Sequence, residues 1–374
     1  MLINIFLVYM KRNLIYGSVL SMAAMSFFLS SCSEDKDYAE EKAFVHFTAT
    51  VDEIGNSLRA QWSMTGLNEM NPNWGDAEHF LWNDGDEMVS LFRGKDASEV
   101  QYNLPVTTVG GESSTQVELN VQLPKNGTAW FFYPSTSIEN YDESSADVEN
   151  AQVSLTIDAT QTPANQKKFA FLRTDEITLK DGKPQSESIN FNHLTSLLRF
   201  HVWNASGRKY VVKSIKIESS KPTVFLKTGN YKLASQDFMV QKDINNSQFA
   251  DELIWDNTNY KSDAPLVKEE GTTSREDIYD ALLITFPVEA EQLEDVDLSI
   301  HVTLADAANN YAEFTPNPLV LKSSDHAAQF AKGFPRGKRT YFNLKISGSN
   351  TLEFANEFEY PGEWSSDEVY VQED

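Results

Sequence analysis

Cysteine is nearly absent from this chain: its 374 residues contain a single one, Cys32. One cysteine excludes a disulfide within the chain and a zinc site built from several cysteines. Glycine and proline are also scarce, at 17 and 13 residues, which excludes a collagen-like or low-complexity protein. Basic residues are outnumbered, because 31 Lys and Arg face 55 Asp and Glu and leave a net charge of -24. This balance argues against a nucleic-acid partner and against charge-driven binding to an anionic membrane surface.

The motifs of several enzyme classes are missing as well. The sequence contains no Gly-x-Ser-x-Gly turn, no Walker loop and no glycine-rich dinucleotide turn. None of the six histidines has the spacing of a helical zinc site. Asp84 and Asp86 flank Gly85 and could be the paired carboxylates of a glycosidase, but Asp-Gly-Asp is also typical of a turn, which we favour. The sequence therefore predicts no enzyme, no metal site and no cofactor.

The first 32 residues have the layout of a bacterial export signal. Lys11 and Arg12 precede an apolar stretch, 13–31, that ends in small residues. The stretch is close to membrane-spanning length, but we favour a cleaved signal because it ends in small residues before Cys32. Leu29-Ser30-Ser31-Cys32 resembles a lipobox, which implies that Cys32 becomes an acylated mature N-terminus. We therefore expect a signal peptide over 1–31.

An acidic tether, 32–43, is expected after the signal. Its acidic run at 33–37 resembles the signal that sends Bacteroidota lipoproteins to the outer face of the outer membrane. The resemblance implies a surface-exposed outer-membrane lipoprotein, held there by its lipid anchor. Met10 directly precedes the basic pair of the signal, so translation starts either there or at Met1.

Alternation of apolar and polar residues at a period of two dominates the rest of the chain. The clearest segments are 117–123, 153–157, 296–304 and 342–346. Each predicts a strand with one buried and one wet face. Segments 129–133 and 282–286 are continuously apolar and predict more central strands, while 192–197 could form one helical turn. Many short strands without helices between them predict an all-β protein of antiparallel sandwiches.

Three polar stretches interrupt this strand pattern, at 135–150, 180–188 and 241–280. Long stretches without secondary structure are uncommon inside compact domains, so the first and the last predict loops that leave the strand framework. The middle stretch is rich in turn residues and lies near the middle of the chain. We place a domain boundary there, which divides the mature chain into an N-terminal domain, 44–187, and a C-terminal domain, 188–374.

Three segments together resemble the fimbrillin family, the type V pilins and their relatives of Bacteroidota. They are 54–92, with Trp82 ahead of Gly85-Asp86; 191–202, Phe-Asn-His-Leu-Thr-Ser-Leu-Leu-Arg-Phe-His-Val; and 334–346, with Gly337-Lys338 ahead of Tyr341. The resemblance implies two transthyretin-like β-sandwich domains in tandem. It also implies a structural or adhesive subunit of surface fimbriae: a stalk, a tip or an anchor. Its implied partners are other fimbrial subunits and a host protein or glycan.

The same resemblance implies a route of assembly. In polymerising members of the family, a protease cuts after an Arg or Lys of the N-terminal domain, the first strand leaves, and a strand of the next subunit replaces it. Here the candidate first strand is 44–51, the candidate cleavage point is Arg59-Ala60, and the candidate donor is the C-terminal tail, 352–372. The alternative is that both ends are ordinary strands and that Arg59 is an exposed loop residue.

A glycan-binding lipoprotein of a nutrient-uptake system is the alternative function. Aromatic faces bind sugars, and the chain has seven tryptophans. Trp130 and Trp203 lie within apolar segments and are predicted to be core residues. Trp74 and Trp255 lie within polar stretches, so these two are the candidate sugar-stacking residues.

Overall fold

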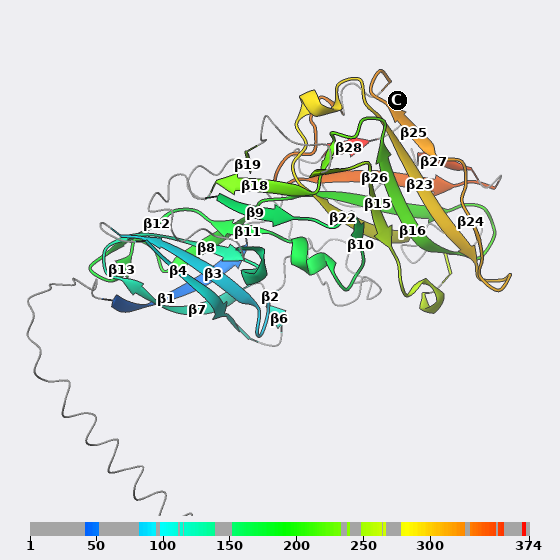
Figure 1. Ribbon diagram of the computed structural model, residues 1–374. Coiled ribbons are helices and arrows are strands. Elements are labelled where there is room, and N and C mark those ends of the chain that lie inside the picture. Colours follow the sequence, from blue (N-terminus) through cyan, green and yellow to red (C-terminus); the bar gives the residue numbers. More distant parts are fainter. Residues whose placement is uncertain are drawn as a thin grey trace, which may run out of the picture. The chain divides into compact units, whose positions relative to one another are not determined.

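The structure, a computed structural model, is built almost entirely of β-strands (Figure 1). It describes residues 42–51, 82–94, 98–110, 113–114, 116–138, 152–232, 238–239, 248–263, 265–266, 278–325, 330–348, 351–354 and 369–371. The chain divides into two units, 1–41 and 42–374, and every described residue belongs to the second. Within these residues no helix has the length and apolar character needed to cross a membrane.

The helical elements that the structure describes over their full length are short 3-10 helices. They are η1 (Ser135–Ile138), η2 (Gln166–Phe169), η4 (Tyr260–Ser262) and η6 (Ala290–Leu293). The predicted all-β class is therefore confirmed. The predicted helical turn at 192–197 is wrong, because these residues end one strand and begin the next.

A ten-stranded sheet forms the first part of the fold. Its strands are β1 (Lys42–Val51), β3 (Glu87–Arg93), β4 (Ser98–Pro105), β5 (Thr107–Thr108), β7 (Gln116–Pro124), β8 (Gly127–Tyr133), β11 (Leu172–Thr174), β12 (Ile177–Lys180), β13 (Lys183–Pro184) and β14 (Ser188–His193). Side chains from seven of these strands meet in one buried cluster, the first-sheet core, which includes Phe47, Leu119, Phe131, Leu172 and Phe191. The sheet therefore folds over its own apolar face, as a sheet must to bury that face.

Two further sheets face each other in the second part of the fold. The six-stranded sheet contains β10 (Thr160–Gln161), β16 (Tyr210–Ser219), β21 (Glu252–Asp256), β23 (Asp297–Asp306), β24 (Ala312–Phe314) and β25 (Leu319–Lys322). The five-stranded sheet contains β15 (Ser196–Asn204), β22 (Ile278–Thr285), β26 (Arg339–Ile346), β27 (Leu352–Phe354) and β28 (Val369–Val371). Apolar residues of both sheets form one cluster, the sandwich core, which includes Phe200, Ile217, Trp255 and Phe342.

Three small sheets complete the fold. Their strands are β2 (Trp82–Asn83) with β6 (Ser113–Ser114), β17 (Phe225–Leu226) with β20 (Phe249–Ala250), and β9 (Gln152–Thr156) with β18 (Thr228–Lys232) and β19 (Phe238–Met239). In the third of these sheets β9 pairs with β18, which lies much later in the sequence, from Thr156↔Thr228 to Gln152↔Lys232. Around it lies a third buried cluster, the bridging cluster, which includes Trp130, Phe132, Tyr231, Ile284 and Phe286.

The alternating segments form strands as predicted. In β7 every second side chain from Val117 to Leu123 is buried, and β23 alternates in the same way up to Leu304. The prediction for 342–346 is wrong in one respect, because Asn343 on the polar face of β26 is buried too, while Lys345 is half-buried. Its polar side chains meet those of neighbouring strands and so do not need water.

Strand directions depart from the predicted antiparallel arrangement. β15 runs parallel to β26 from Leu197↔Arg339 to Asn204↔Ile346, and β1 runs parallel to β14 at its C-terminal end. Parallel neighbours need long connections, and each of these pairs is separated by more than a hundred residues. β14 lies directly after the boundary predicted between Glu187 and Ser188; that boundary stays a prediction.

Two further expectations about position are wrong. The stretch 241–280 is not a continuous excursion, because β21 lies within it with Leu253 and Trp255 buried. β22 is not central, because it ends the order of the five-stranded sheet. Its apolar run, 281–284, has another cause: Leu283 faces the sandwich core, while Leu282 and Ile284 face the bridging cluster.

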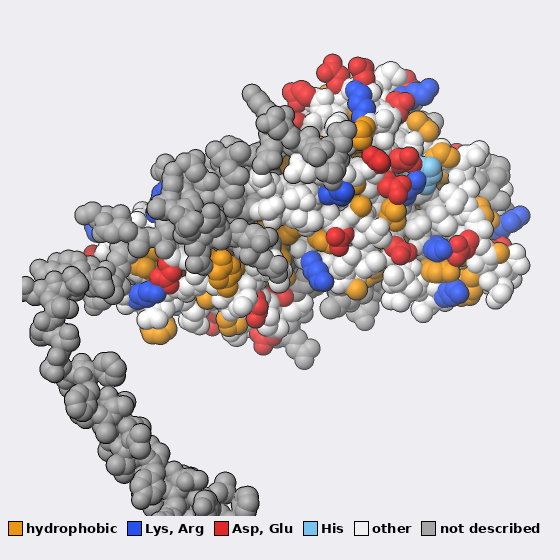
Figure 2. All heavy atoms as spheres, in the orientation of Figure 1, with side chains coloured by type: hydrophobic (Ala, Val, Ile, Leu, Met, Phe, Trp, Pro, Cys, Tyr) orange, Lys and Arg blue, Asp and Glu red, His pale blue; other side chains and the backbone are white. Residues whose placement is uncertain are grey.

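The surface mixes charges of both signs. On the face drawn in Figure 2, acidic and basic side chains are interspersed. The outer face of the six-stranded sheet carries ion pairs of this kind, with Nζ of Lys216 at 2.9 Å from carboxylate oxygens of both Glu218 and Glu252. Exposed pairs of this kind stabilise a fold by at most about 1 kcal/mol. Because charges of both signs are interspersed on the face drawn in Figure 2, the acidic excess does not form one continuous field there.

Candidate functional site

The first described strand, β1, is an inner strand of the ten-stranded sheet. It pairs antiparallel with β7 from Lys42↔Pro124 to Thr50↔Gln116 and parallel with β14 from Thr48↔Ser188 to Val51↔Phe191. Its side chains alternate as predicted: Phe47 and Ala49 are 0% exposed, whereas Phe44 on the other face is 82% exposed. The predicted first strand, 44–51, is therefore a strand with one buried face.

Removal of β1 would open a groove between β7 and β14. Phe47 fills the centre of that groove, with its ring 5.3 Å from the ring of Phe131 in an edge-to-face arrangement. Leu119 and Phe191, from the two flanking strands, belong to the same core. Main-chain hydrogen bonds on both sides and apolar side chains on one face are the features by which a strand is added to a sheet.

The predicted donor tail pairs with its own chain. β27 runs antiparallel to β26 from Ile346↔Leu352 to Leu344↔Phe354, and β28 runs parallel to β26 from Thr340↔Val369 to Phe342↔Val371. Both lie along the edge of β26 that β15 does not use. The strand character predicted for 352–354 and 368–372 is borne out at Leu352–Phe354 and Val369–Val371, whereas 358–360 lies outside the described residues.

Most of the site residues predicted from the sequence lie outside the described residues. These are Cys32, Arg59, Ala60 and Trp74. Trp255 is described, and the sugar-stacking prediction for it is wrong. Its side chain is 0% exposed in the sandwich core, and its Nε1–H donates to the Tyr279 hydroxyl at 2.9 Å. Its ring therefore offers no open face to a sugar.

Asp84 and Asp86 have the turn role that we favoured. Gly85 between them has φ +86°, a conformation open to glycine at little cost. The Asp86 carboxylate accepts from the backbone N–H of Asn83 at 2.9 Å, and the Asp84 carboxylate accepts from that of Thr108 at 3.0 Å. Both carboxylates thus stabilise the turn before β3.

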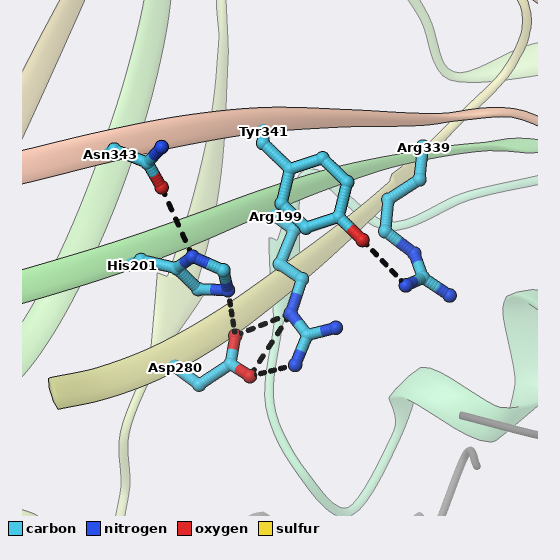
Figure 3. Close-up of polar contacts among 6 residues, drawn as sticks. All are labelled: Arg199, His201, Asp280, Arg339, Tyr341 and Asn343. Atoms are coloured by element: carbon cyan, nitrogen blue, oxygen red, sulfur yellow. Dashed lines mark hydrogen bonds and ion pairs between the residues drawn. The ribbon is translucent and has the colours of Figure 1, made fainter. Parts of the chain in front are cut away.

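A buried polar cluster on the five-stranded sheet was not predicted. It contains Arg199 and His201 of β15, Asp280 of β22, and Arg339, Tyr341 and Asn343 of β26 (Figure 3). Because side chains of a strand alternate between faces, all six lie on the face opposite the sandwich core. The sequence carried a signal: polar residues recur at every second position in both 199–201 and 339–343. These positions fall within two of the three segments that resemble fimbrillins.

An ion pair lies at the centre of this polar cluster. Nε of Arg199 donates to both carboxylate oxygens of Asp280, at 2.9 and 3.0 Å, and Nη2 donates to Oδ2 as well. Arg199 is 9% exposed. Burial by itself raises the pKa of Asp280, but the charge and hydrogen bonds of Arg199 outweigh it and hold that pKa below its usual value. Asp280 is therefore ionised at neutral pH.

His201 lies beside this ion pair and is 2% exposed. Its Nδ1–H donates to Oδ1 of Asn343 at 3.0 Å, and its Nε2 lies 3.7 Å from Oδ1 of Asp280. Burial lowers the pKa of His201 to about 4; the carboxylate of Asp280 opposes this effect and the charge of Arg199 adds to it. His201 is therefore neutral at pH 7.

The third strand of the polar cluster contributes a second arginine. Nη1 of Arg339 lies 2.8 Å from the Tyr341 hydroxyl oxygen, to which it donates. The guanidinium groups of Arg199 and Arg339 lie 5.9 and 5.7 Å from the centre of the Tyr341 ring. Contacts of this kind are attractive because a cation meets the electron-rich ring face. The polar cluster thus ties β22, β15 and β26 together through their side chains.

Potential metal ligands do not gather in the described part of the chain. No three His, Cys, Asp or Glu side chains there lie together as a metal site would require. His193, within the second resembling segment, is buried, and burial together with the charge of Arg339 lowers its pKa to about 3.

Comparison with known proteins gives solved structures alone. No protein-family model and no curated sequence matches the chain. A candidate cell adhesion protein from Bacteroides ovatus is similar, with 13% identity, a TM-score of 0.47, and coverage of 84% of this chain and 97% of that chain. A fimbrial protein from Bacteroides vulgatus has 11% identity and a TM-score of 0.43, covering 82% and 97%.

A tip fimbrial protein from Porphyromonas gingivalis with a C-terminal truncation is also similar. It has 9% identity and a TM-score of 0.35, and the match covers 82% of this chain and 95% of that chain. These three solved structures are described as fimbrial or cell adhesion proteins. At these TM-scores the similarity assigns no role to any residue.

Proposed function

We propose that this chain is a fimbrillin-like subunit of cell-surface fimbriae, structural or adhesive in role, exported as a lipoprotein and held at the outer membrane by an acylated Cys32. The observation that carries the proposal is where the resembling segments lie. β15 and β26, from two of them, pair over eight consecutive residues at the middle of one sheet, and Phe191, the first residue of the segment that contains β15, pairs with Val51 of β1. Two of the resembling segments therefore meet in one sheet, and one of them also reaches β1.

Assembly by strand exchange is part of this proposal. β1 is the first described strand, and its register on β7 and β14 supports the idea that a strand from another subunit can take its place. Such a strand would make the same main-chain hydrogen bonds, and its alternate side chains would fill the space of Phe47 and Ala49. The alternative, a glycan-binding lipoprotein, now depends on Trp74, since Trp255 is buried.

Isolated surface filaments provide the direct test. Filaments sheared from cells that make this chain should contain it, as an antibody against the chain would detect. A chain found in the outer membrane and never in sheared filaments would exclude stalk and tip roles. The glycan-binding alternative would be favoured if such membranes bound a polysaccharide and lost that binding in Trp74→Ala.

Anchoring is tested separately with Cys32→Ala. Two or three acyl chains hold a protein on a bilayer firmly, since each buried CH₂ contributes about 0.8 kcal/mol. The variant should therefore lose membrane association or accumulate unprocessed, measured by fractionation and by the mass of the N-terminal peptide. A matched change at the adjacent Ser33→Ala should leave fractionation unchanged. Firm membrane retention of processed Cys32→Ala would rule out the anchor.

A further inference from the structure

β22 is an edge strand of the five-stranded sheet. One side pairs with β15 from Ser196↔Thr285 to Trp203↔Ile278, and no described strand pairs with the other. An edge strand presents a row of backbone N–H and C=O groups that can pair with another chain. In β22 these groups lie among apolar residues, since Ile284 is 0% exposed, so leaving them unpaired would be costly.

Two glutamine side chains cover this edge. Nε2 of Gln161 donates to the backbone O of Ile284 at 2.6 Å, and the N–H of Ile284 donates to Oε1 of Gln161 at 2.9 Å. Nε2 of Gln166 donates to the backbone O of Leu282. The Gln161 amide therefore pairs with Ile284 as a residue of a neighbouring strand would.

The glutamines are themselves deeply buried, at 0% exposure for Gln161 and 2% for Gln166. Burying an amide is unfavourable unless its hydrogen bonds are made. Here the hydrogen bonds are made to the β22 edge, with one further contact at 3.4 Å from Nε2 of Gln161 to the backbone O of Asp158. Apolar residues would fill the same space at no such cost, so the amides are explained by the edge that they cover.

The segment that carries both glutamines, 158–171, is attached near both of its ends. The backbone of Gln161 belongs to β10 and pairs parallel with Trp255 of β21, in the opposite sheet of the sandwich. At the other end, the ring of Phe171 stacks on that of Phe286 at 6.2 Å. We call 158–171 the capping segment, because it holds both amides against the β22 edge.

We propose that the capping segment closes a strand-acceptor edge on β22, and that a second copy of this chain, through its own β22, would occupy that edge if the glutamines were absent. Two copies of one edge strand can pair antiparallel about a two-fold axis, so the edge is complementary to itself. The capping segment thereby confines strand addition to other parts of the molecule. This inference does not depend on the proposed function.

The test compares the full-length chain with Gln161→Leu/Gln166→Leu. These changes remove every hydrogen bond from the two side chains to β22, so that apolar packing alone holds the capping segment and it opens more often. Amide hydrogen exchange over 278–285, read by mass spectrometry, should become about tenfold faster at low protein concentration. Light scattering should show the mass doubling as concentration rises, while the wild-type mass stays constant. The matched control is Gln116→Leu/Gln122→Leu, which adds two leucines on the exposed face of β7 and should change neither readout.

Wild-type exchange over 278–285 in the double variant overturns the proposal. Faster exchange at an unchanged mass overturns the second copy as the occupant. If the double variant does not fold, Gln161→Met replaces it, because methionine is unbranched and apolar and has no N–H to donate to the Ile284 carbonyl. Unchanged exchange in folded Gln161→Met also overturns the cap.

Discussion

At the scale of single residues, the polar cluster is the least expected feature of the fold. Arg199 and Asp280 form an ion pair whose side chains are only 11% and 23% exposed. A buried pair of this kind adds little net stability, but loss of one partner typically costs 3–5 kcal/mol because the other charge remains. Its value here lies in register. A one-residue slip of β15 on β22 would send Arg199 into the apolar sandwich core.

The neutral histidines predict how stability depends on pH. The pKa values of His201 and His193, about 4 and about 3, lie below the ordinary 6.5, so the folded state binds fewer protons than the unfolded state. The part of the free energy of unfolding that depends on these neutral histidines is fully present above pH 6.5 and is lost as the pH falls toward those pKa values. For His201 alone, the lowering corresponds to roughly 3 kcal/mol. Stability should therefore decrease steadily between about pH 6.5 and 4, as measured by urea unfolding.

His201→Gln isolates this effect, because glutamine is neutral at every pH. The variant is expected to be less stable than wild type at pH 7.5, since it loses the contact with Asn343. The difference in free energy of unfolding between the two proteins should be smaller by roughly 2 kcal/mol at pH 4.5. Parallel stability profiles for the two proteins across this range would show that His201 does not titrate as inferred.

At the scale of elements, β1 is the first strand of the described residues and has a fixed register on both of its neighbours. The main chain of β1 is paired on both sides, and its buried face is held by three apolar side chains, Val45, Phe47 and Ala49. For comparison, β28 pairs over three residues at a sheet edge. To leave its sheet, β1 must therefore lose main-chain pairing with two neighbouring strands, whereas β28 must lose a three-residue pairing with β26.

The alternation within β1 predicts a large difference between two phenylalanines. Phe47→Ala leaves a cavity beside Phe131 and should destabilise the fold by about 3–5 kcal/mol. Phe44→Ala, three residues earlier on the 82% exposed face, should change stability by less than about 0.5 kcal/mol. Chemical unfolding of the two variants measures this. Equal effects would mean that β1 does not contribute to the core as described.

Local pattern was sufficient for some elements and insufficient for others. β7 and β23 each bury one face, so the alternation of apolar and polar residues in the sequence was enough to predict them. β22 shows the limit: its run 281–284 is apolar because both faces are buried, and such a run does not distinguish a central strand from one at the edge of its sheet. Trp255 was misplaced because five strand residues, β21, lie inside a long polar stretch whose average composition hides them.

The candidate site was predicted in part for similar reasons. The first strand could be found because its own residues alternate. The polar cluster could not, because it forms only when β15 and β26 pair in parallel across more than a hundred residues. Each strand by itself shows polar residues at alternate positions, which ordinarily face water. Pairing between distant strands is set by the packing of the whole chain and leaves little trace in any one segment.

At the scale of the whole molecule, connectivity determines what one proteolytic cut can release. β1 ends at Val51 and the next described strand, β2, begins at Trp82, so a cut at Arg59-Ala60 leaves β1 attached to the rest of its subunit by non-covalent contacts alone. A replacing strand must then make the same hydrogen bonds to β7 and β14. Arg173, Arg199 and Arg339 are at most 9% exposed and are protected from a protease, whereas Arg93 at the end of β3 is half-buried.

Limited trypsin treatment of the full-length chain is therefore expected to create a new terminus at Ala60, found by N-terminal sequencing, and to be followed by oligomers that resist SDS. The expected resistance comes from a strand paired on both sides, whose exchange requires breaking all of its main-chain hydrogen bonds together. Arg59→Gln should keep the chain intact at this position and monomeric under the same treatment. Cleavage at Ala60 that leaves the chain monomeric would exclude a polymerising stalk and favour an anchor or tip subunit, because these need not exchange strands.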